Sequence, residues 1–395
     1  MSDFNSLSVN QVRHHEVDWL RIFVVLSLVP VHGAMVFVEP FFFVKNAEKS
    51  EWLWNFVVFM SAWRMPLLFL VSGFGTWYAL RKRTVREYIR ERAARLLIPL
   101  LFGIFFIIPP QIWVEKNYQI PLDQRVTFWE FLKSAWVGIY PKGNLSYHHL
   151  WFLLYLFLFS LLLLPLFLWV KSKKESGNTN QRMIPWNLGI LFLWFFELIL
   201  RPISGSLPVL VGDWANLFQY SYLFFLGFIL AQNRQYLDGL VRQWHLNFVV
   251  LSILVAVNFN VGWRHFPAPG YSPEYLSYIF VRSSITWFGI STAIGFFGHY
   301  AKKFHPSLEL LKLGVFPFYI LHQTVLVVAA YGLIRLQWSL PVKFITLCLG
   351  TYLVCALMIR YIILPLPFLH VFFGIKNPSP KQNDLKPQVS MCSPS

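Results

Sequence analysis

The stretch VDWLRIFVVLSLVPVHGAMVF (residues 17–37) decides the fold class of this chain. Its apolar run is about 20 residues long, which as an α-helix crosses a hydrocarbon core of about 30 Å. Similar runs, separated by short polar stretches, recur along the chain as far as His370. Spanning segments must satisfy their own backbone polar groups, and the alternation typical of barrel strands is absent from this sequence. The pattern therefore predicts an all-α fold, a polytopic transmembrane helical bundle.

About ten spans fit this pattern, with both termini cytoplasmic. Cytoplasmic segments of membrane proteins carry an excess of Lys and Arg, and this orientation places about 19 of these residues inside against about 10 outside. We expect a cytoplasmic N-terminal segment (1–16), one membrane domain (17–372) and a disordered cytoplasmic tail (373–395). The expected spans are residues 17–38, 52–80, 95–114, 149–170, 186–201, 214–232, 245–263, 276–300, 308–332 and 343–370.

Two connecting segments differ from the other short loops. The segment KSKKESGNTNQR (171–182) is polar, and we expect it to be a mobile internal loop. The longest external loop (115–148) carries Trp129, Trp136 and Tyr140, residue types that favour the membrane interface. We expect short interfacial helices there, forming part of a substrate mouth.

The formal net charge of the chain is +16, a value that could indicate a nucleic-acid partner. The densest basic block, Arg81 to Arg95, lies between two apolar spans, where such charge usually sets topology. The partner indicated by this charge is therefore the lipid bilayer and not nucleic acid. The sequence carries no signal for an oligomeric state.

The first span carries Arg21 and His32. Eleven steps of 100° bring both side chains to one face of a helix, about 16 Å apart along its axis. Asp18 precedes Arg21 by three residues and is close enough to pair with it. Arg21 could instead extend to the headgroups, and His32 could bond into the kink at Pro30. Ionisable groups deep in a span are rare and usually face an interior cavity, so we interpret His32 as functional.

The basic stretch LRKRTVREYIRERAARLLIP (80–99) follows the second expected span and is predicted to be helical. Arg92 and Arg95 are three residues apart and share a helix face. Two guanidinium groups at this spacing can form a fork for phosphate oxygens, a geometry that Arg provides better than Lys. The alternative is that both residues only add positive-inside charge and contact anionic lipid.

Two more histidines lie in other expected spans. His149 opens HLWFLLYL (149–156) at the external surface, and His322 lies about 21 Å up a span that runs outward from Leu308. With His32, three histidines from separate spans would therefore occupy the outer half of the bundle. A metal site among them is not predicted, because no tight ligand spacing supports one.

Four further ionisable residues lie within the expected spans. Glu197 and Arg201 are four residues apart near the outer end of the fifth span and are expected to form an ion pair. Arg64 and Arg282 are additional cations for which the sequence assigns no partner.

On these residues the chain resembles the acyltransferase 3 family of integral membrane acyltransferases. The resemblance is carried by DWLR (18–21) with His32 at the family's R-x10-H spacing, MPLLFLVSGF (65–74), RERAARLLIP (90–99), HLWFLLYL (149–156) and FPFYILHQ (316–323). These motifs fall in the family's order and cover most of the chain. WRMPLLFLVSGF together with HLWFLLYL is also similar to the periplasmic-glucan succinyltransferase subgroup.

The resemblance implies transfer of an acyl group, acetyl or succinyl, from cytoplasmic acyl-CoA to a hydroxyl of an extracytoplasmic carbohydrate, in a bacterial inner membrane. It implies that Arg21 and His32 belong to the active site, and that Arg92 and Arg95 hold the donor. Acyl-CoA is then a co-substrate, and no metal or other bound cofactor is required.

Within this interpretation, His32 acts as general base or forms an acyl-histidine intermediate, and the sequence leaves both routes open. Ser72 and His322 are candidates for stabilising the oxyanion, while Asp18 and His149 are possible supporting residues.

Two other classes of function are alternatives to an acyltransferase. A transporter or flippase of a lipid-linked sugar or small acid also fits ten spans with internal cations, but the sequence shows neither an inverted repeat nor matched broken helices. A non-catalytic membrane scaffold or sensor fits poorly, because buried ionisable groups are costly without a function.

Overall fold

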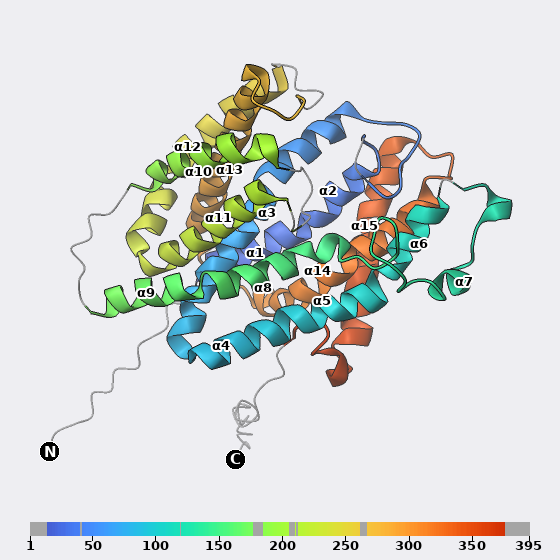
Figure 1. Cartoon of the computed structure of the whole chain (residues 1–395), viewed down its shortest axis with the longest axis horizontal. Helices are drawn as coiled ribbons and strands as arrows, with labels where there is room; N and C mark the ends of the chain where they lie inside the picture. Colours follow the sequence, from blue (N-terminus) through green and yellow to red (C-terminus); the bar gives the residue numbers. More distant parts are fainter. Residues whose placement is uncertain are drawn as a thin grey trace, which may run out of the picture.

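A computed structural model describes residues 14–39, 42–118, 120–176, 185–204, 210, 212–260 and 267–375. Its helices pack into one bundle (Figure 1). They are α1 (His15–Leu26), α2 (Leu28–Met35), α3 (Glu51–Lys82), α4 (Val85–Arg92), α5 (Ile98–Phe102), α6 (Pro109–Asn117), α7 (Phe128–Leu132), α8 (Trp151–Leu162), α9 (Leu164–Glu175), α10 (Gly189–Leu200), α11 (Trp214–Gln232), α12 (Arg234–Asn260), α13 (Pro273–Tyr300), α14 (Pro306–Leu333) and α15 (Leu340–Met358).

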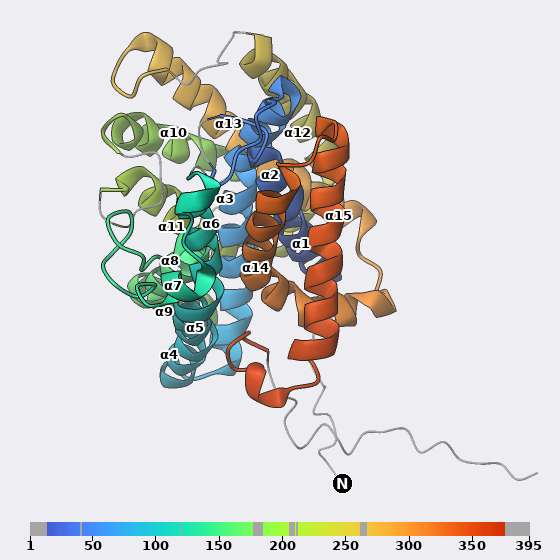
Figure 2. The same ribbon diagram turned by 90° about the vertical axis from the view of Figure 1, so that its right-hand side faces the viewer.

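The all-α class and the number of spans are confirmed. Within the described ranges, nine helices are long and apolar enough to cross a membrane, and a tenth span results if α8 and α9, bent by 52°, count as one. The described segments contain no β-strand. Figure 2 shows α14 and α15 on one side of the bundle and α8 to α11 on the other.

Both ends of the described chain lie at the same end of the bundle. His14 packs edge-on against Phe74, near the last turns of α3, with ring centroids 5.2 Å apart. At the other terminus, a Cβ added to Gly374 would lie 3.5 Å from the carbonyl oxygen of Arg95, which follows α4. The turn between α3 and α4 is rich in Arg and Lys, so positive-inside charge predicts that this end faces the cytoplasm.

The first span is broken at Ser27, between α1 and α2. Pro30 lacks an N–H and prevents a normal helical bond to the carbonyl of Leu26, which instead accepts a hydrogen bond from the Tyr352 hydroxyl at 2.7 Å. Ser27 thus separates α1, which ends at Leu26, from α2, which carries His32.

The basic stretch after the second span is helical, as expected. Thr84 and Glu87 form a capping box that starts α4, in which each side chain accepts a hydrogen bond from the other residue's backbone N–H. The run then continues through a π-helical turn (Ala93–Leu97) into α5 and α6 without leaving the span. Arg95 lies in that π-turn, a kind of local irregularity that is common at functional sites.

Two expectations about connecting segments have different outcomes. Residues 171–175 were expected in a polar loop but form the last turns of α9, where Lys171 donates to the carbonyl of Leu80 at 2.9 Å, so that part of the prediction is wrong. The external segment does contain short helices, α7 and Leu122–Gln124. Residues 1–13, 177–184 and the tail from 376 lie outside the described residues, so the expectations for them remain predictions.

Helices α3 and α11 approach closely at two glycines. A Cβ added to Gly73 would lie 1.8 Å from the carbonyl oxygen of Phe224, and one added to Gly227 would lie 1.9 Å from that of Leu70. Small residues at helix crossings let backbones approach closely, and packing of this kind is a principal source of stability between helices in lipid.

Substituting Gly227 with alanine is therefore expected to destabilise the protein by about 1–3 kcal/mol, the usual cost of overpacking a tight contact. The measurement is the apparent Tm of the purified protein in detergent. Gly350→Ala is the control, because a Cβ there meets nothing within 4 Å and alanine is the better helix former. Equal melting of Gly227→Ala and wild type would contradict the close approach of α3 and α11.

Candidate active site

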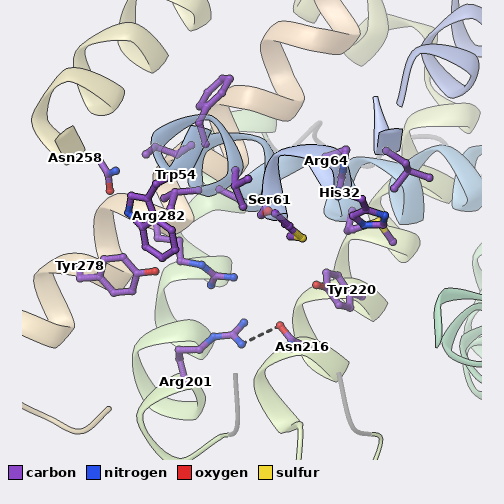
Figure 3. A pocket seen from close by; sticks show the side chains of 18 of the residues that line it. His32, Trp54, Ser61, Arg64, Arg201, Asn216, Tyr220, Asn258, Tyr278 and Arg282 are labelled. Atoms are coloured by element: carbon purple, nitrogen blue, oxygen red, sulfur yellow. Dashed lines mark hydrogen bonds between the residues drawn. The ribbon is translucent and has the colours of Figure 1, made fainter. Parts of the chain in front are cut away.

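A cavity of about 570 Å³ lies inside the bundle, bordered by residues of α2, α3, α11, α13 and α14 (Figure 3). This volume lies within the range that small-molecule sites usually have, about 300–1,000 Å³. Its lining combines three kinds of side chain: histidines (His32, His149, His322), arginines (Arg64, Arg201, Arg282) and aromatic residues (Trp54, Trp151, Tyr220, Tyr275, Tyr278, Tyr319).

The three histidines from separate spans meet, as their expected depths suggested. The Nε2 atom of His322 lies 3.3 Å from Nδ1 of His32, and their rings stack with centroids 5.2 Å apart. The ring of His149 stands perpendicular to that of His322, at 5.3 Å between centroids. His32 and His322 thus line the cavity side by side.

The hydrogen bonds of His322 assign the proton positions of the neutral pair. Nδ1 of His322 lies 2.6 Å from the carbonyl oxygen of Tyr319, and since a carbonyl only accepts, this nitrogen carries the proton. Nε2 of His322 must then accept, so Nδ1 of His32 donates to it. The lone pair of His32 consequently lies on Nε2, the nitrogen that a base in this cavity needs.

His149 is held by hydrogen bonds at both ring nitrogens. Its Nε2 lies 3.0 Å from the carbonyl oxygen of Ile320, and its Nδ1 lies 3.4 Å from the Gln111 amide nitrogen. The Tyr319 hydroxyl donates to the His149 carbonyl at 2.6 Å. These bonds fix the orientation of His149 beside the His32–His322 pair. In the part of the chain that the structure describes, no three His, Cys, Asp or Glu side chains are arranged to hold a metal ion.

The opposite wall of the cavity contains a buried ionic cluster. Arg201 forms the expected pair with Glu197 through two hydrogen bonds of 2.8 and 3.0 Å, and also donates to Asn216 at 2.8 Å. Arg282 approaches the same carboxylate at 3.4 Å. One carboxylate is therefore shared by two guanidinium groups that face the cavity (Figure 3).

Asp213 adds a second acidic residue beside this cluster. It precedes α11, and the Tyr155 hydroxyl donates to it at 2.7 Å. Burial raises the pKa of the Asp213 carboxyl, while the Tyr155 hydrogen bond and the nearby charge of Arg201 oppose that shift. Sequence inspection missed this residue, because an Asp immediately before a helix usually indicates only a helix cap.

Arg21 lies with Arg92 and Arg95, the two residues predicted to hold the donor, at the other end of the bundle. Arg21 lies 3.6 Å from Asp18, and Asp18 also pairs with Lys312 of α14 at 3.6 Å. Arg92 donates to the Thr76 hydroxyl at 2.8 Å. Arg95 is near enough to both Arg92 and Arg21 to interact with them electrostatically. The three arginines thus form one cationic group, called here the basic cluster.

The cavity and the basic cluster are separate in this structure. His32 lines the cavity, whereas Arg21, Arg92 and Arg95 do not. Ser72 lies between these regions on α3; its hydroxyl donates to the Leu68 carbonyl at 2.8 Å and does not line the cavity. Arg21 and His32 therefore occupy two different regions, although they lie on one span.

This arrangement defines a multi-pass membrane protein with a histidine-lined cavity inside its bundle. The family model of an acyltransferase domain, acyltransferase 3, matches residues 14–360. The chain belongs to the acyltransferase 3 family, which confirms the resemblance seen in its motifs.

Curated relatives carry the name Glucans biosynthesis protein C. The protein of Escherichia coli (strain K12) is 26% identical over 227 residues, which cover 55% of this chain and 57% of that protein. The protein of Salmonella heidelberg (strain SL476) is 26% identical over 234 residues, covering 56% and 58% respectively. The chain thus spans less than three fifths of the length of these relatives. No solved structure matches the chain.

Proposed function

We propose that this protein is an O-acyltransferase that moves an acetyl or succinyl group from cytoplasmic acyl-CoA to a hydroxyl of an extracytoplasmic carbohydrate. The observation that carries the proposal is the His32–His322 hydrogen bond, which directs the lone pair of His32 to Nε2 within a cavity. Family membership supports the acyl transfer, and the name of the relatives supports a glucan as acceptor. The bacterial inner membrane is the corresponding location.

In the proposed reaction, His32 is the general base. The acceptor hydroxyl attacks the thioester carbon while its proton passes to Nε2 of His32. The resulting tetrahedral intermediate collapses, the C–S bond breaks, and the imidazolium returns the proton to the CoA sulfur. An ester and free CoA are the products, with acyl-CoA as co-substrate and no metal required by this step.

The donor enters from the basic cluster in this proposal. Phosphate groups of CoA favour guanidinium forks, and Arg92 and Arg95 present two such groups beside Arg21. The pantetheine arm then has to reach from the basic cluster to His32 in the cavity. Because the cavity does not extend to Arg21, this path requires side chains between α1 and α3 to move when the donor binds.

The lining of the cavity away from His32 suits a sugar. Trp54, Trp151 and Tyr278 offer aromatic surfaces with polar tips, and Asn216 and Asn258 add amide groups. Such a mixture can pack against a sugar ring and hydrogen-bond its hydroxyls.

The test is release of free CoA by the purified, detergent-solubilised protein. Acetyl-CoA and succinyl-CoA are supplied separately as labelled donors, with extracted cell-envelope glycans as acceptor. CoA release that depends on the acceptor and leaves acyl label on sugar supports the proposal. Binding of acyl-CoA without turnover would favour the transporter alternative, and flux of the labelled compound across proteoliposomes would then decide between them.

Substitution of both Arg92 and Arg95 by alanine is expected to raise the KM for acyl-CoA at least about tenfold, because a hydrogen bond to a charged group contributes about 1.5–3 kcal/mol. Turnover at saturating donor should change less, since neither side chain lines the cavity. The control is Arg86→Ala with Arg90→Ala, which removes two exposed cations from the same helix. Equal KM values for the two double variants would show that Arg92 and Arg95 only add positive-inside charge and do not hold the donor.

A further inference from the structure

Arg64 of α3 is a buried cation in the wall of the cavity, with a side chain that is only partly satisfied. The residue is 3% exposed, and its Nη1 donates to the carbonyl of Ser27 at 3.3 Å. Its Nε atom is buried and has no hydrogen-bond partner. Figure 3 shows Arg64 next to His32, and the two groups are close enough to interact electrostatically.

No acidic side chain among the described residues compensates this charge. Arg64 forms no ion pair there, and the Glu197 carboxylate, which lies behind the cavity wall, is engaged by Arg201 and Arg282. A buried guanidinium without a counter-ion costs several kcal/mol of desolvation. Such a cost is tolerated where the charge meets a negative group during function.

The position of Arg64 is coupled to that of His32 through the break in the first span. The Ser27 carbonyl that accepts from Arg64 lies at that break, and His32 lies in the helix that begins immediately after it. The same part of the first span therefore carries His32 and accepts the hydrogen bond of Arg64. A base and a cation fixed by one backbone feature can keep a constant separation during catalysis.

We propose that Arg64 is a catalytic residue whose guanidinium group, which borders the cavity, stabilises the oxyanion of the acyl-transfer reaction; this inference rests on the proposed function. As the acceptor oxygen bonds to the thioester carbon and His32 takes its proton, the carbonyl π electrons move onto oxygen. Arg64 donates to that oxyanion until the carbonyl re-forms and the C–S bond breaks, with the proton passing from His32 to the CoA sulfur.

Other candidates for this role have fewer free donors. His322 donates through Nδ1 to the Tyr319 carbonyl and accepts at Nε2, so neither of its nitrogens is available as a donor. The Ser72 hydroxyl donates to the Leu68 carbonyl and lies outside the cavity lining. Arg201 is committed to Glu197 and Asn216. Arg64 combines a position in the cavity wall with a positive charge that forms no ion pair among the described residues.

The experiment compares Arg64→Gln, Arg64→Lys and Arg64→Ala with wild type, using acetyl-CoA and succinyl-CoA as separate donors. Loss of one oxyanion donor typically lowers kcat by about 100- to 1,000-fold, and we expect this for Arg64→Gln with both donors. The KM for each donor should change little. Arg64→Lys should retain part of the activity, and guanidinium ions should partly restore Arg64→Ala where sodium chloride of equal ionic strength does not.

The control variant is Arg242→Gln, which removes an exposed cation of α12 outside the cavity. Loss confined to succinyl-CoA, expressed as a raised KM, would overturn the inference and assign Arg64 to the carboxylate of the acyl group. Unchanged kcat in Arg64→Gln would overturn it as well. Absence of turnover in wild type with every donor would instead count against the proposed function.

Should Arg64→Gln fail to fold, as judged by gel filtration and acyl-CoA binding, the guanidinium test on Arg64→Lys and Arg64→Ala decides. Rescue of Arg64→Ala supports a role at the oxyanion, because a purely structural cation would not restore kcat in a protein that already binds donor. Folded, donor-binding variants that no guanidinium concentration rescues, with Arg64→Lys as active as wild type, would overturn the inference.

Discussion

His32→Ala is expected to lower the rate of acyl transfer by about 100- to 10,000-fold, the usual contribution of a general base. The reason is specific to the geometry: Nδ1 of His32 is bonded to His322, so Nε2 is the proton acceptor that the acceptor hydroxyl would meet. Binding of acyl-CoA should persist, since the basic cluster does not include His32. The measurement is CoA release at saturating donor and acceptor, together with the donor Kd.

His245→Ala serves as the control for that variant, because His245 is exposed on α12 and does not line the cavity. Wild-type turnover by His32→Ala would remove His32 from the mechanism. Rapid quenching of the wild-type protein after mixing with donor alone distinguishes general-base catalysis by His32 from an acyl-histidine intermediate. An acyl adduct on His32 would indicate a covalent intermediate, whereas no adduct with normal turnover would indicate direct transfer.

Hydropathy was enough to predict the fold class, because span length and helical hydrogen bonding are properties of each segment by itself. The same is true of local pairs. Asp18 with Arg21 and Glu197 with Arg201 are three and four residues apart, and both pairs are present. The third member of the second cluster, Arg282, comes from another helix, and no local rule places it there.

The first span shows that helical periodicity alone does not predict which of its residues line the cavity. Helical periodicity predicts that Arg21 and His32 lie on one face, a conclusion that assumes a continuous helix. The structure interrupts the helix at Ser27, although α1 and α2 still form one span, and of the two residues only His32 lines the cavity. Pro30 was the available signal for this break, but the hydrogen bonds that stabilise it come from Tyr352 and Arg64, far along the sequence.

The meeting of the histidines also depended on tertiary packing. Their depths in separate spans were predictable from rise per residue, yet contact between His32 and His322 requires that α2 and α14 turn the correct faces towards each other. The proton position on His32 follows only from the Tyr319 carbonyl beside His322. No composition or spacing in the sequence contains that information.

The ionic cluster around Glu197 is expected to contribute strongly to the stability of the folded protein. Glu197 is 1% exposed and is the carboxylate shared by Arg201 and Arg282. Replacing it with leucine leaves buried guanidinium charge without a counter-ion, and breaking such a pair typically costs about 3–5 kcal/mol. We therefore expect Glu197→Leu to show a strongly lowered apparent Tm in detergent, or to fail to accumulate as a monodisperse protein.

The comparison that isolates this effect is the double variant Glu197→Leu with Arg201→Leu. Removing both partners eliminates the principal unpaired charge, so the double variant should melt above the single variant although it carries one more substitution. Glu274→Gln, which changes an exposed carboxylate of α13, should melt like wild type. A double variant less stable than Glu197→Leu would mean that Arg201 stabilises the bundle through Asn216 and packing, and that its charge needs no partner in the cavity wall.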